Sequence, residues 1–348
     1  MLENKNIDAL IIGAGHNGLV CAYYLAKAGL NVHIFEQRHI VGGAAVTEEF
    51  HPGFRNSVAS YTVSLLNPQV INDMKLKKYG LSIVKRPISN FLPINNTNYL
   101  KLGGGLEKTQ AEFRKFSERD ANRLPDYYER IEAVADVLRD LSIKTPPNPK
   151  QGIKALIGAA LQAWPIVKKG NQVHKDVYDL FTKSARSFLD SWFENEHIKA
   201  AFGFDAIVGN YASPDTPGSA YVLLHHVFGE VDGEKGAWGH AIGGMGAITQ
   251  AMQQACMDVG VKITTSAPVK KVMVDNKKVT GIQLENGDII NASKVISNLN
   301  PTLLYKKLID QNDLSEEFNR SMDGYKSGSG TFRMNVALSE LPDFTSLP

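Results

Sequence analysis

Three glycines near the start of the chain have the spacing that a diphosphate-binding turn requires. Gly13, Gly15 and Gly18 follow the apolar run 8–12 and precede the helix-forming run 19–27. Glycine permits the tight turn off a strand, lets the backbone approach a pyrophosphate, and lets the following helix lie close to the sheet. The amide groups at the start of that helix favour an anion. The remaining residues of this predicted cofactor loop are Ala14, His16 and Asn17.

A carboxylate follows at the distance where such units bind an adenosine ribose. The second apolar run, 32–35, ends at Glu36, about twenty residues after the glycine turn. Glu36 can accept hydrogen bonds from both ribose hydroxyls and would repel a 2′-phosphate, which disfavours NADP. Glycines also cluster in purely structural turns, but strand, helix and carboxylate in one register favour a dinucleotide.

A second glycine element comes directly after Glu36 and separates a flavin site from a nicotinamide site. We therefore predict FAD as the cofactor. The predicted cofactor-binding residues of this element are Gln37, Arg38, Gly42, Gly43, Ala44 and Thr47.

Size and composition indicate a globular protein of about two domains, with 348 residues and 43% hydrophobic residues. A net charge of +2 gives no reason to expect nucleic-acid binding. The two cysteines form no CxxC motif, and we expect no metal site. The first six residues lack the apolar core of a secretion signal, and no run of about eighteen apolar residues occurs. We expect a cytoplasmic protein.

The order of predicted elements suggests a discontinuous nucleotide domain. A helix over 245–259, a strand over 261–264, an antiparallel meander from 269 to 290 and a strand over 294–298 follow a long helical region. We predict an FAD-binding domain from residues 1–60 and 238–305, and a substrate domain from 61–237 and 306–348. Helices are expected within the latter over 106–143, 153–164, 173–192, 196–204 and 218–226.

Three segments together resemble a known family. The runs 13–20, 38–47 and 243–247 are similar to the phytoene dehydrogenase-like FAD-dependent oxidoreductases, which share a fold with the amine oxidases. The resemblance implies an α/β fold, with a Rossmann-like FAD-binding domain of the amine oxidase and phytoene desaturase type and an inserted α+β substrate domain. It also implies a mitochondrial matrix location for eukaryotic relatives.

The resemblance assigns roles to particular residues. Gly13, Gly15 and Gly18 would line the pyrophosphate, and Glu36 would bind the ribose. Thr47 would lie near the pyrophosphate or ribityl end of the cofactor. Further along the dinucleotide would lie Arg38, Gly42 and Gly43, and the backbone of Val269 would meet the adenine.

The chain departs from the family pattern at two places. Many relatives have arginine where Ala44 stands here, so one cation near the cofactor is missing. Relatives also continue beyond this length, with a glycine-rich strand–helix segment that covers the flavin. We therefore expect a chain that is truncated at its C-terminus.

The expected function is hydride transfer from a hydrophobic, carotenoid- or lipid-like substrate to the flavin N5, as in a desaturase or dehydrogenase. Oxidation of an amine is the alternative within the same class, and the motifs do not separate the two. A non-catalytic regulatory or interaction protein that retains the flavin fold is the alternative of another class. The sequence identifies no catalytic residue and leaves protein partners and a homo-oligomer open.

Other residues have simpler explanations than catalysis. His225 and His226 are adjacent in a predicted helix and cannot face one metal together, so packing is favoured. His16 is expected to border the flavin, with a role as a base left open. Loop packing is slightly favoured for three residues that could face the substrate: Arg55, Ser60 and Tyr61. Glu129 and Asp136 are most simply solvated.

The apolar segment 153–164 has lysines on both sides. It is too short to span a bilayer but could lie in a membrane interface and admit a lipophilic substrate. An ordinary core helix explains it equally well. Peripheral membrane contact is therefore an expectation with an open alternative.

Overall fold

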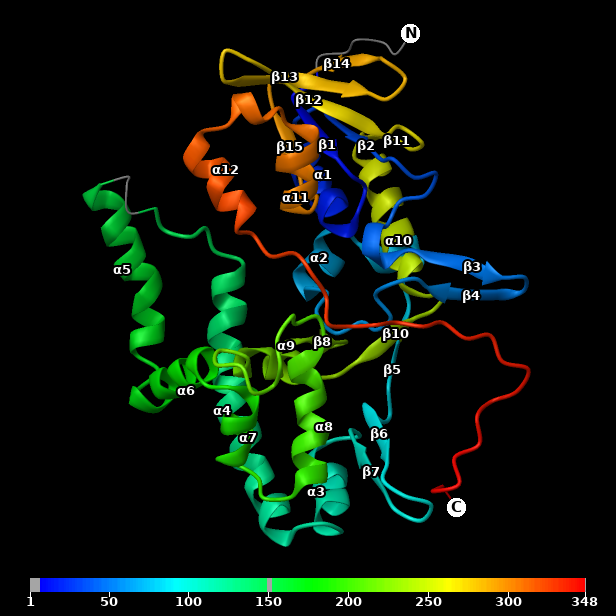
Figure 1. Ribbon diagram of the computed structural model, residues 1–348, viewed down its shortest axis with the longest axis vertical. Helices are drawn as coiled ribbons and strands as arrows, with labels where there is room; N and C mark the ends of the chain where they lie inside the picture. The colour runs from blue at the N-terminus through cyan, green and yellow to red at the C-terminus, as the bar shows by residue number, and fades with distance from the viewer. Residues whose placement is uncertain (1–6, 149–151, 348) are drawn as a thin grey trace.

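A four-stranded parallel sheet lies in the upper half of the molecule as drawn in Figure 1, a computed structural model that describes residues 7–148 and 152–347. The strands stand in the order β11 (Lys262–Thr264), β2 (Val32–Phe35), β1 (Ala9–Ile12) and β15 (Val295–Ser297). Strand β1 pairs with β15, with Ile11 opposite Ile296. Two segments almost three hundred residues apart in the chain therefore build one sheet.

Side chains of β1 alternate between two buried faces. Ala9 and Ile11 pack on one face, which is covered by α1 (His16–Lys27) and α10 (Met245–Asp258). Leu10 and Ile12 pack on the other, under an antiparallel meander of β12 (Val269–Asp275), β13 (Lys278–Leu284) and β14 (Ile289–Asn291). A strand that is buried on both faces needs apolar residues throughout, which explains the continuous apolar run of β1; in β2 the exception is His33, which is buried and contacts the Thr264 hydroxyl.

The lower half is mainly helical (Figure 1). Its core gathers aromatic rings around Tyr127, which contacts Trp192, Phe193 and Phe202 with ring centroids 5.5, 5.0 and 5.1 Å away. Its helices are α3 (Leu106–Arg114), α4 (Glu118–Ser142), α5 (Ile153–Val167), α6 (Asn171–Thr182), α7 (Ala185–Asp190), α8 (Glu196–Ile207) and α9 (His225–Phe228), with a 3₁₀ turn over Ala220–Leu224. The strands of this half form two hairpins, β6 (Asn90–Pro93) with β7 (Tyr99–Leu102) and β8 (Glu230–Val231) with β9 (Glu234–Lys235).

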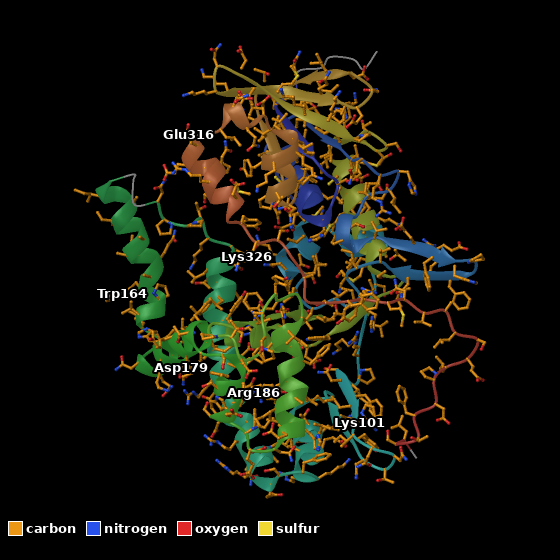
Figure 2. All side chains as sticks on the ribbon, in the orientation of Figure 1. Lys101, Trp164, Asp179, Arg186, Glu316 and Lys326 are labelled. Atoms are coloured by element: carbon orange, nitrogen blue, oxygen red, sulfur yellow. The ribbon has the colours of Figure 1, made fainter. Side chains whose placement is uncertain are left out.

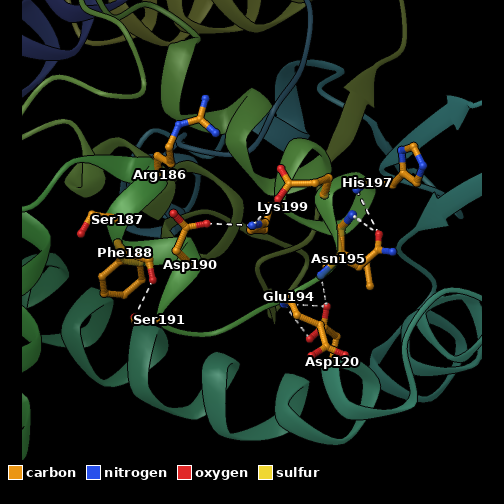
Figure 3. A network of polar contacts seen from close by, with 12 residues as sticks. Asp120, Arg186, Ser187, Phe188, Asp190, Ser191, Glu194, Asn195, His197 and Lys199 are labelled. Carbon is orange, nitrogen blue, oxygen red and sulfur yellow. Dashed lines mark hydrogen bonds and ion pairs between the residues drawn. The ribbon is translucent and has the colours of Figure 1, made fainter.

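A buried carboxylate joins α4 to the loop before α8 (Figure 3). Asp120 is fully buried and accepts hydrogen bonds from the backbone N–H groups of Glu194 and Asn195, at 2.9 to 3.1 Å. The side chain of Asn195 in turn caps α8, and Lys199 of α8 pairs with Asp190 of α7 at 2.8 Å. These contacts fix the helices of the lower half relative to one another.

Other elements connect the halves. A ribbon of β5 (Ile83–Lys85) and β10 (Gly239–Ala241) leads from the lower half to α10, and the hairpin of β3 (Thr47–His51) and β4 (Phe54–Ser57) projects to one side (Figure 1). Further short elements are α2 (Pro68–Asp73), a 3₁₀ turn over Leu76–Tyr79, α11 (Pro301–Leu303), a π-helical turn over Leu304–Leu308, a 3₁₀ turn over Gln311–Asp313 and α12 (Glu316–Asp323). The last described segment, 325–347, runs without helix or strand past β4.

Three predicted helices are wrong in their extent. The helix predicted over 106–143 is divided into α3 and α4, because Ser117 is extended and its hydroxyl accepts from the Asp120 N–H. The helix predicted over 173–192 is divided into α6 and α7, because Ser184 is extended and its hydroxyl accepts from the Ser187 N–H, which begins a new helix. The helix predicted over 218–226 is a 3₁₀ turn followed by the single turn α9.

The division into two domains stays a prediction, and the packing adds detail to it. Val63, Met74 and Leu76 are buried in the same core as α1 and α10, beyond the predicted boundary at residue 60. Leu308 packs under the meander, beyond the boundary at residue 305.

Candidate functional site

The carboxyl ends of the four parallel strands meet at one edge of the sheet, where ligands bind in open α/β folds. The turn after β1 and the glycine element after β2 lie side by side at this edge. The Gly42 N–H donates to the Ala14 carbonyl at 2.8 Å, and Gly15 and Gly42 form a parallel bridge. The structure thus brings the two sequence motifs together into one backbone surface.

The glycines of the first loop are required by close packing. A Cβ on Gly18 would lie 2.3 Å from the carbonyl oxygen of Gly13, so α1 could not approach the strand as it does. Gly13 has a positive φ of 96°, which favours glycine. Gly15 stands at the N-cap of α1, and no side chain of the described residues caps this end. The first amides of α1 are therefore free to receive an anion.

The second loop packs against the first at similarly short range. A Cβ on Gly43 would lie 3.1 Å from the Cα of Gly15, and one on Gly42 would lie 2.9 Å from the Thr249 hydroxyl. Both glycines also have positive φ. A side chain at either position would clash with neighbouring protein atoms, so the loops need glycine to pack as they do.

Glu36 is buried and connects the loops. One carboxylate oxygen accepts from the Ala14 N–H at 2.8 Å, and the other accepts from the Arg38 N–H at 2.9 Å. Each oxygen has a second lone pair, so the carboxylate can still accept from hydroxyl groups. Glu36 therefore has a structural role in addition to the predicted contact with ribose.

Two other predicted residues are held by the protein itself. Thr47 is buried and accepts from the Gly246 N–H at 2.9 Å, while Ser57 accepts from the Met245 N–H at 2.9 Å. Both hydroxyls thus stabilise the N-terminus of α10, a role that sequence reasoning missed for Thr47 and Ser57. Arg38 forms an ion pair with Glu48 of β3.

The remaining predicted contacts lie around the same edge. Gln37 and Ala44 are exposed. Val269 begins β12, and the Ala267 N–H, two residues earlier, donates to the Glu36 carbonyl at 2.9 Å, which ties the start of the meander to Glu36. The Asn17 amide donates to Asn298 at 2.9 Å. Sequence reasoning missed Asn298, although its place at the end of a predicted strand was the available signal.

His16 lies at the start of α1, where its ring is partly exposed. Desolvation by the surrounding atoms lowers its pKa below 6.5, so the neutral ring is favoured at neutral pH. That His16 borders the flavin stays a prediction.

The residues predicted to face the substrate surround the C-terminal segment. Arg333 donates to the carbonyls of Ala59 and Ser57, and its guanidinium lies 4.9 Å from the Tyr61 ring centroid. Arg55 is exposed and Ser60 is half-buried. The packing explanation for Tyr61 therefore has a specific partner.

A cavity of about 720 Å³ lies in the lower half beneath the β5–β10 ribbon. Its lining mixes apolar and charged side chains, among them Leu102, Phe202, Trp238, Arg86 and Glu129. Arg86 donates to His240 at 2.7 Å and lies 5.8 Å from the Trp238 ring centroid. Sequence reasoning missed this group, because its members are widely separated in the chain.

Two further expectations have definite outcomes. The Asp136 side chain is 39% exposed, as predicted, and it also has protein partners: although burial opposes it, hydrogen bonds from Lys235 and Arg139, both at 2.7 Å, lower its pKa. His225 faces the Asp205 carbonyl at 3.3 Å, as packing predicts, and the side chain of His226 lies outside the described residues. The described part of the chain, residues 7–148 and 152–347, contains no group of three or more His, Cys, Asp or Glu residues that could hold a metal ion.

These features define the class of protein, and the comparisons with known proteins define the family. Two glycine loops, an open helix N-terminus and a buried carboxylate at the edge of a parallel sheet make a dinucleotide-binding α/β protein. The family of flavin containing amine oxidoreductases matches residues 18–331. The chain belongs to this family, which confirms the predicted fold class and the prediction of FAD as cofactor.

Individual relatives agree with this assignment. The chain is 37% identical to pyridine nucleotide-disulfide oxidoreductase domain-containing protein 2 of Rattus norvegicus, over 98% of this chain and 61% of that protein. It is 23% identical to a lycopene-forming phytoene desaturase of Pantoea ananas, over 96% of this chain and 64% of that protein. A putrescine oxidase structure with bound putrescine matches with a TM-score of 0.58 at 19% identity, over 92% of this chain and 63% of that one. The chain spans about three fifths of the length of these proteins.

The feature that fits the cofactor of the family is the N-terminus of α1, because its first amides have no side-chain cap among the described residues and can receive a pyrophosphate. None of the helices in the described part of the chain combines the length and apolar character needed to cross a bilayer.

Proposed function

We propose that the chain binds FAD along the edge formed by its two glycine loops, as part of an oxidoreductase that oxidises a hydrophobic substrate. The observation that carries the proposal is the direct contact between the loops, in which Gly42 donates to Ala14 beside the uncapped N-terminus of α1. An uncapped helix end next to closely packed glycines suits a diphosphate.

The protein residues would divide the work of binding. The first amides of α1 receive the pyrophosphate, and Glu36 accepts from the ribose hydroxyls. The start of β12 at Val269 meets the adenine. When bound, the flavin supplies the hydride acceptor, at N5, for a C–H bond of the substrate.

The cavity of about 720 Å³ is the proposed place of the substrate. Its apolar residues, such as Leu102, Phe202 and Trp238, would contact a lipid-like or isoprenoid molecule. Two relatives, one named as part of a limonene dehydrogenase and one as a phytoene desaturase, support this class of substrate.

Amine oxidation is the second candidate, and one observation favours it. Glu129 and Glu132 line the cavity, and carboxylates attract an ammonium group. Glu132 already pairs with Arg139 at 2.7 Å, which leaves Glu129 as the carboxylate better placed for a cationic substrate. Anaerobic flavin reduction by a monoterpene, compared with a primary amine, distinguishes the two candidates.

The cofactor assignment is tested by flavin retention in Glu36→Ala. We expect retention to fall at least tenfold, because the carboxylate both contacts ribose and holds the loops in place. Glu285→Ala, in the exposed turn between β13 and β14, is the matched control and should retain flavin normally. Equal retention in both variants contradicts the assigned contact. A wild-type protein that stays colourless with added FAD favours the non-catalytic alternative.

A further inference from the structure

Helix α5 presents its most apolar side chains to solvent. Ile153 is 76% exposed, Leu161 70%, Trp164 56%, Ile157 56% and Val167 55%. Spacings of three and four residues place these five side chains along one side of the helix. We call this set the apolar stripe of α5. In a helix of a globular protein such a stripe normally faces the core.

Three residues on the opposite side of α5 are more buried than the stripe. Ala155, Ala159 and Gln162 are half-buried, although they are smaller or more polar than the stripe residues. Figure 1 shows α5 at the margin of the molecule, apart from the other helices, and Figure 2 labels Trp164 on it. The core-helix explanation of segment 153–164 is therefore wrong.

Charge at the C-terminal end of α5 indicates what covers the stripe. The sequence of α5 contains no aspartate or glutamate, and lysines follow it before the first carboxylate, Asp176. Lys168 and Lys169 follow the helix directly and are exposed, and the Lys168 ammonium lies 5.3 Å from the Trp164 ring centroid. Lysine beside tryptophan at the end of an apolar stripe is typical of a helix in the plane of an anionic lipid surface.

The next helix continues the exposed apolar surface with aromatic rings. Tyr178 of α6 is 68% exposed, and Phe181 of α6 stacks on Tyr221 with centroids 5.5 Å apart. Tyrosine and tryptophan are enriched where hydrocarbon meets water. Both helices thus expose apolar and aromatic side chains to solvent.

We propose that the apolar stripe of α5 inserts into the interface of a membrane that contains anionic lipids. The helix has 15 residues, about 22 Å of length, so it lies in the plane of the bilayer and does not span it. Lys168 and Lys169, directly after the helix, contact the headgroups, and the stripe enters the acyl boundary.

Vesicle flotation of the 348-residue protein tests the proposal. One set of vesicles contains phosphatidylcholine alone, and the other contains equal parts of phosphatidylcholine and phosphatidylserine. The variants are Leu161→Glu with Trp164→Glu, and Lys168→Glu with Lys169→Glu. Ile289→Glu, on the exposed side of β14 in the upper half, is the matched control. Because all the altered side chains are exposed, we expect each variant to fold. Melting temperatures verify this.

We expect the wild type and Ile289→Glu to float with the anionic vesicles. The stripe variant should bind these vesicles at least tenfold more weakly, and the lysine variant should lose binding and its salt dependence. Recovery that the stripe variant leaves unchanged overturns the proposal. Sedimentation velocity without lipid supplies the other overturning result: a dimer that only the stripe variant abolishes, with no binding to either vesicle, assigns the stripe to a second copy of the chain.

Discussion

The sheet edge of the upper half and the helical core of the lower half differ in whether their polar groups have partners within the protein. In the lower half, buried carboxylates have partners within the protein. Asp120 accepts from two backbone N–H groups, Asp176 pairs with Arg130, and Asp179 accepts from Lys175 and Lys183. At the sheet edge, the first amides of α1 have no side-chain cap among the described residues. Satisfied polar groups hold a scaffold together, whereas open amides are available to a ligand.

Glu36 stands between these two cases. It is as buried as the carboxylates of the lower half and also accepts from two backbone N–H groups. The hydrogen bonds that it accepts position the glycine loops, and the proposed contact with ribose would give the same residue a second role. A substitution of Glu36 can therefore change both the free energy of unfolding and the binding of flavin, and the two must be measured separately.

The largest effect is expected at the sheet edge, in Gly18→Ala. The added Cβ would meet the Gly13 carbonyl oxygen at 2.3 Å, and both atoms belong to backbone that cannot move aside. We expect a loss of roughly 4 kcal/mol in the free energy of unfolding together with loss of bound flavin. Gly158→Ala in α5, where a Cβ meets open space, is the control and should be neutral or slightly stabilising. Denaturant unfolding measures both variants, and similar behaviour would show that the close approach is not required.

The next effect is expected in the lower half, in Asp120→Ala. The change leaves the Glu194 and Asn195 N–H groups without their acceptor, at a cost of about 3 kcal/mol in the free energy of unfolding. Asp190→Ala, which removes a more exposed partner of Lys199, should cost about 1 kcal/mol or less. Urea titration distinguishes the two. Equal costs would mean that burial does not set the value of these contacts.

The smallest effect concerns pH and separates the two halves. His33 in β2 is buried and contacts the Thr264 hydroxyl at 2.8 Å; desolvation, assisted by Lys262, lowers its pKa to about 4. Below pH 6.5 the His33 ring is protonated in the unfolded chain but stays neutral in the folded chain. The free energy of unfolding therefore falls as the pH falls. We expect a loss of about 2 kcal/mol between about pH 6.5 and 5.

The control for this prediction is His33→Gln, which should flatten the dependence in that range. The pKa values of Asp136 and Asp179 in the lower half are also lowered. Their contribution to stability is lost only as the pH falls below about 4, which is outside the range measured for His33. Urea midpoints measured from about pH 7 to 5 decide the matter. A wild-type urea midpoint that does not change with pH would contradict the lowered pKa of His33.

Much of the fold and part of the site could be predicted from local patterns. The strand, glycine turn, helix and Glu36 lie within thirty residues, where spacing and periodicity are directly readable. The α10–β11–meander–β15 series was also predictable, because each element has its own apolar run and turn residues. The break at Ser184 was not, since its capping hydrogen bond competes with a continuing helical pattern.

The sequence by itself determined the cofactor loops, because a turn off a strand depends on residues that are neighbours in the chain. Only the tertiary structure decided that Thr47 and Ser57 cap α10, that Gly42 meets Ala14, and that the apolar stripe of α5 faces outward. The physical reason is that periodicity identifies which side of an element is apolar. It does not identify what that side meets, which depends on hydrogen bonds and packing between distant segments.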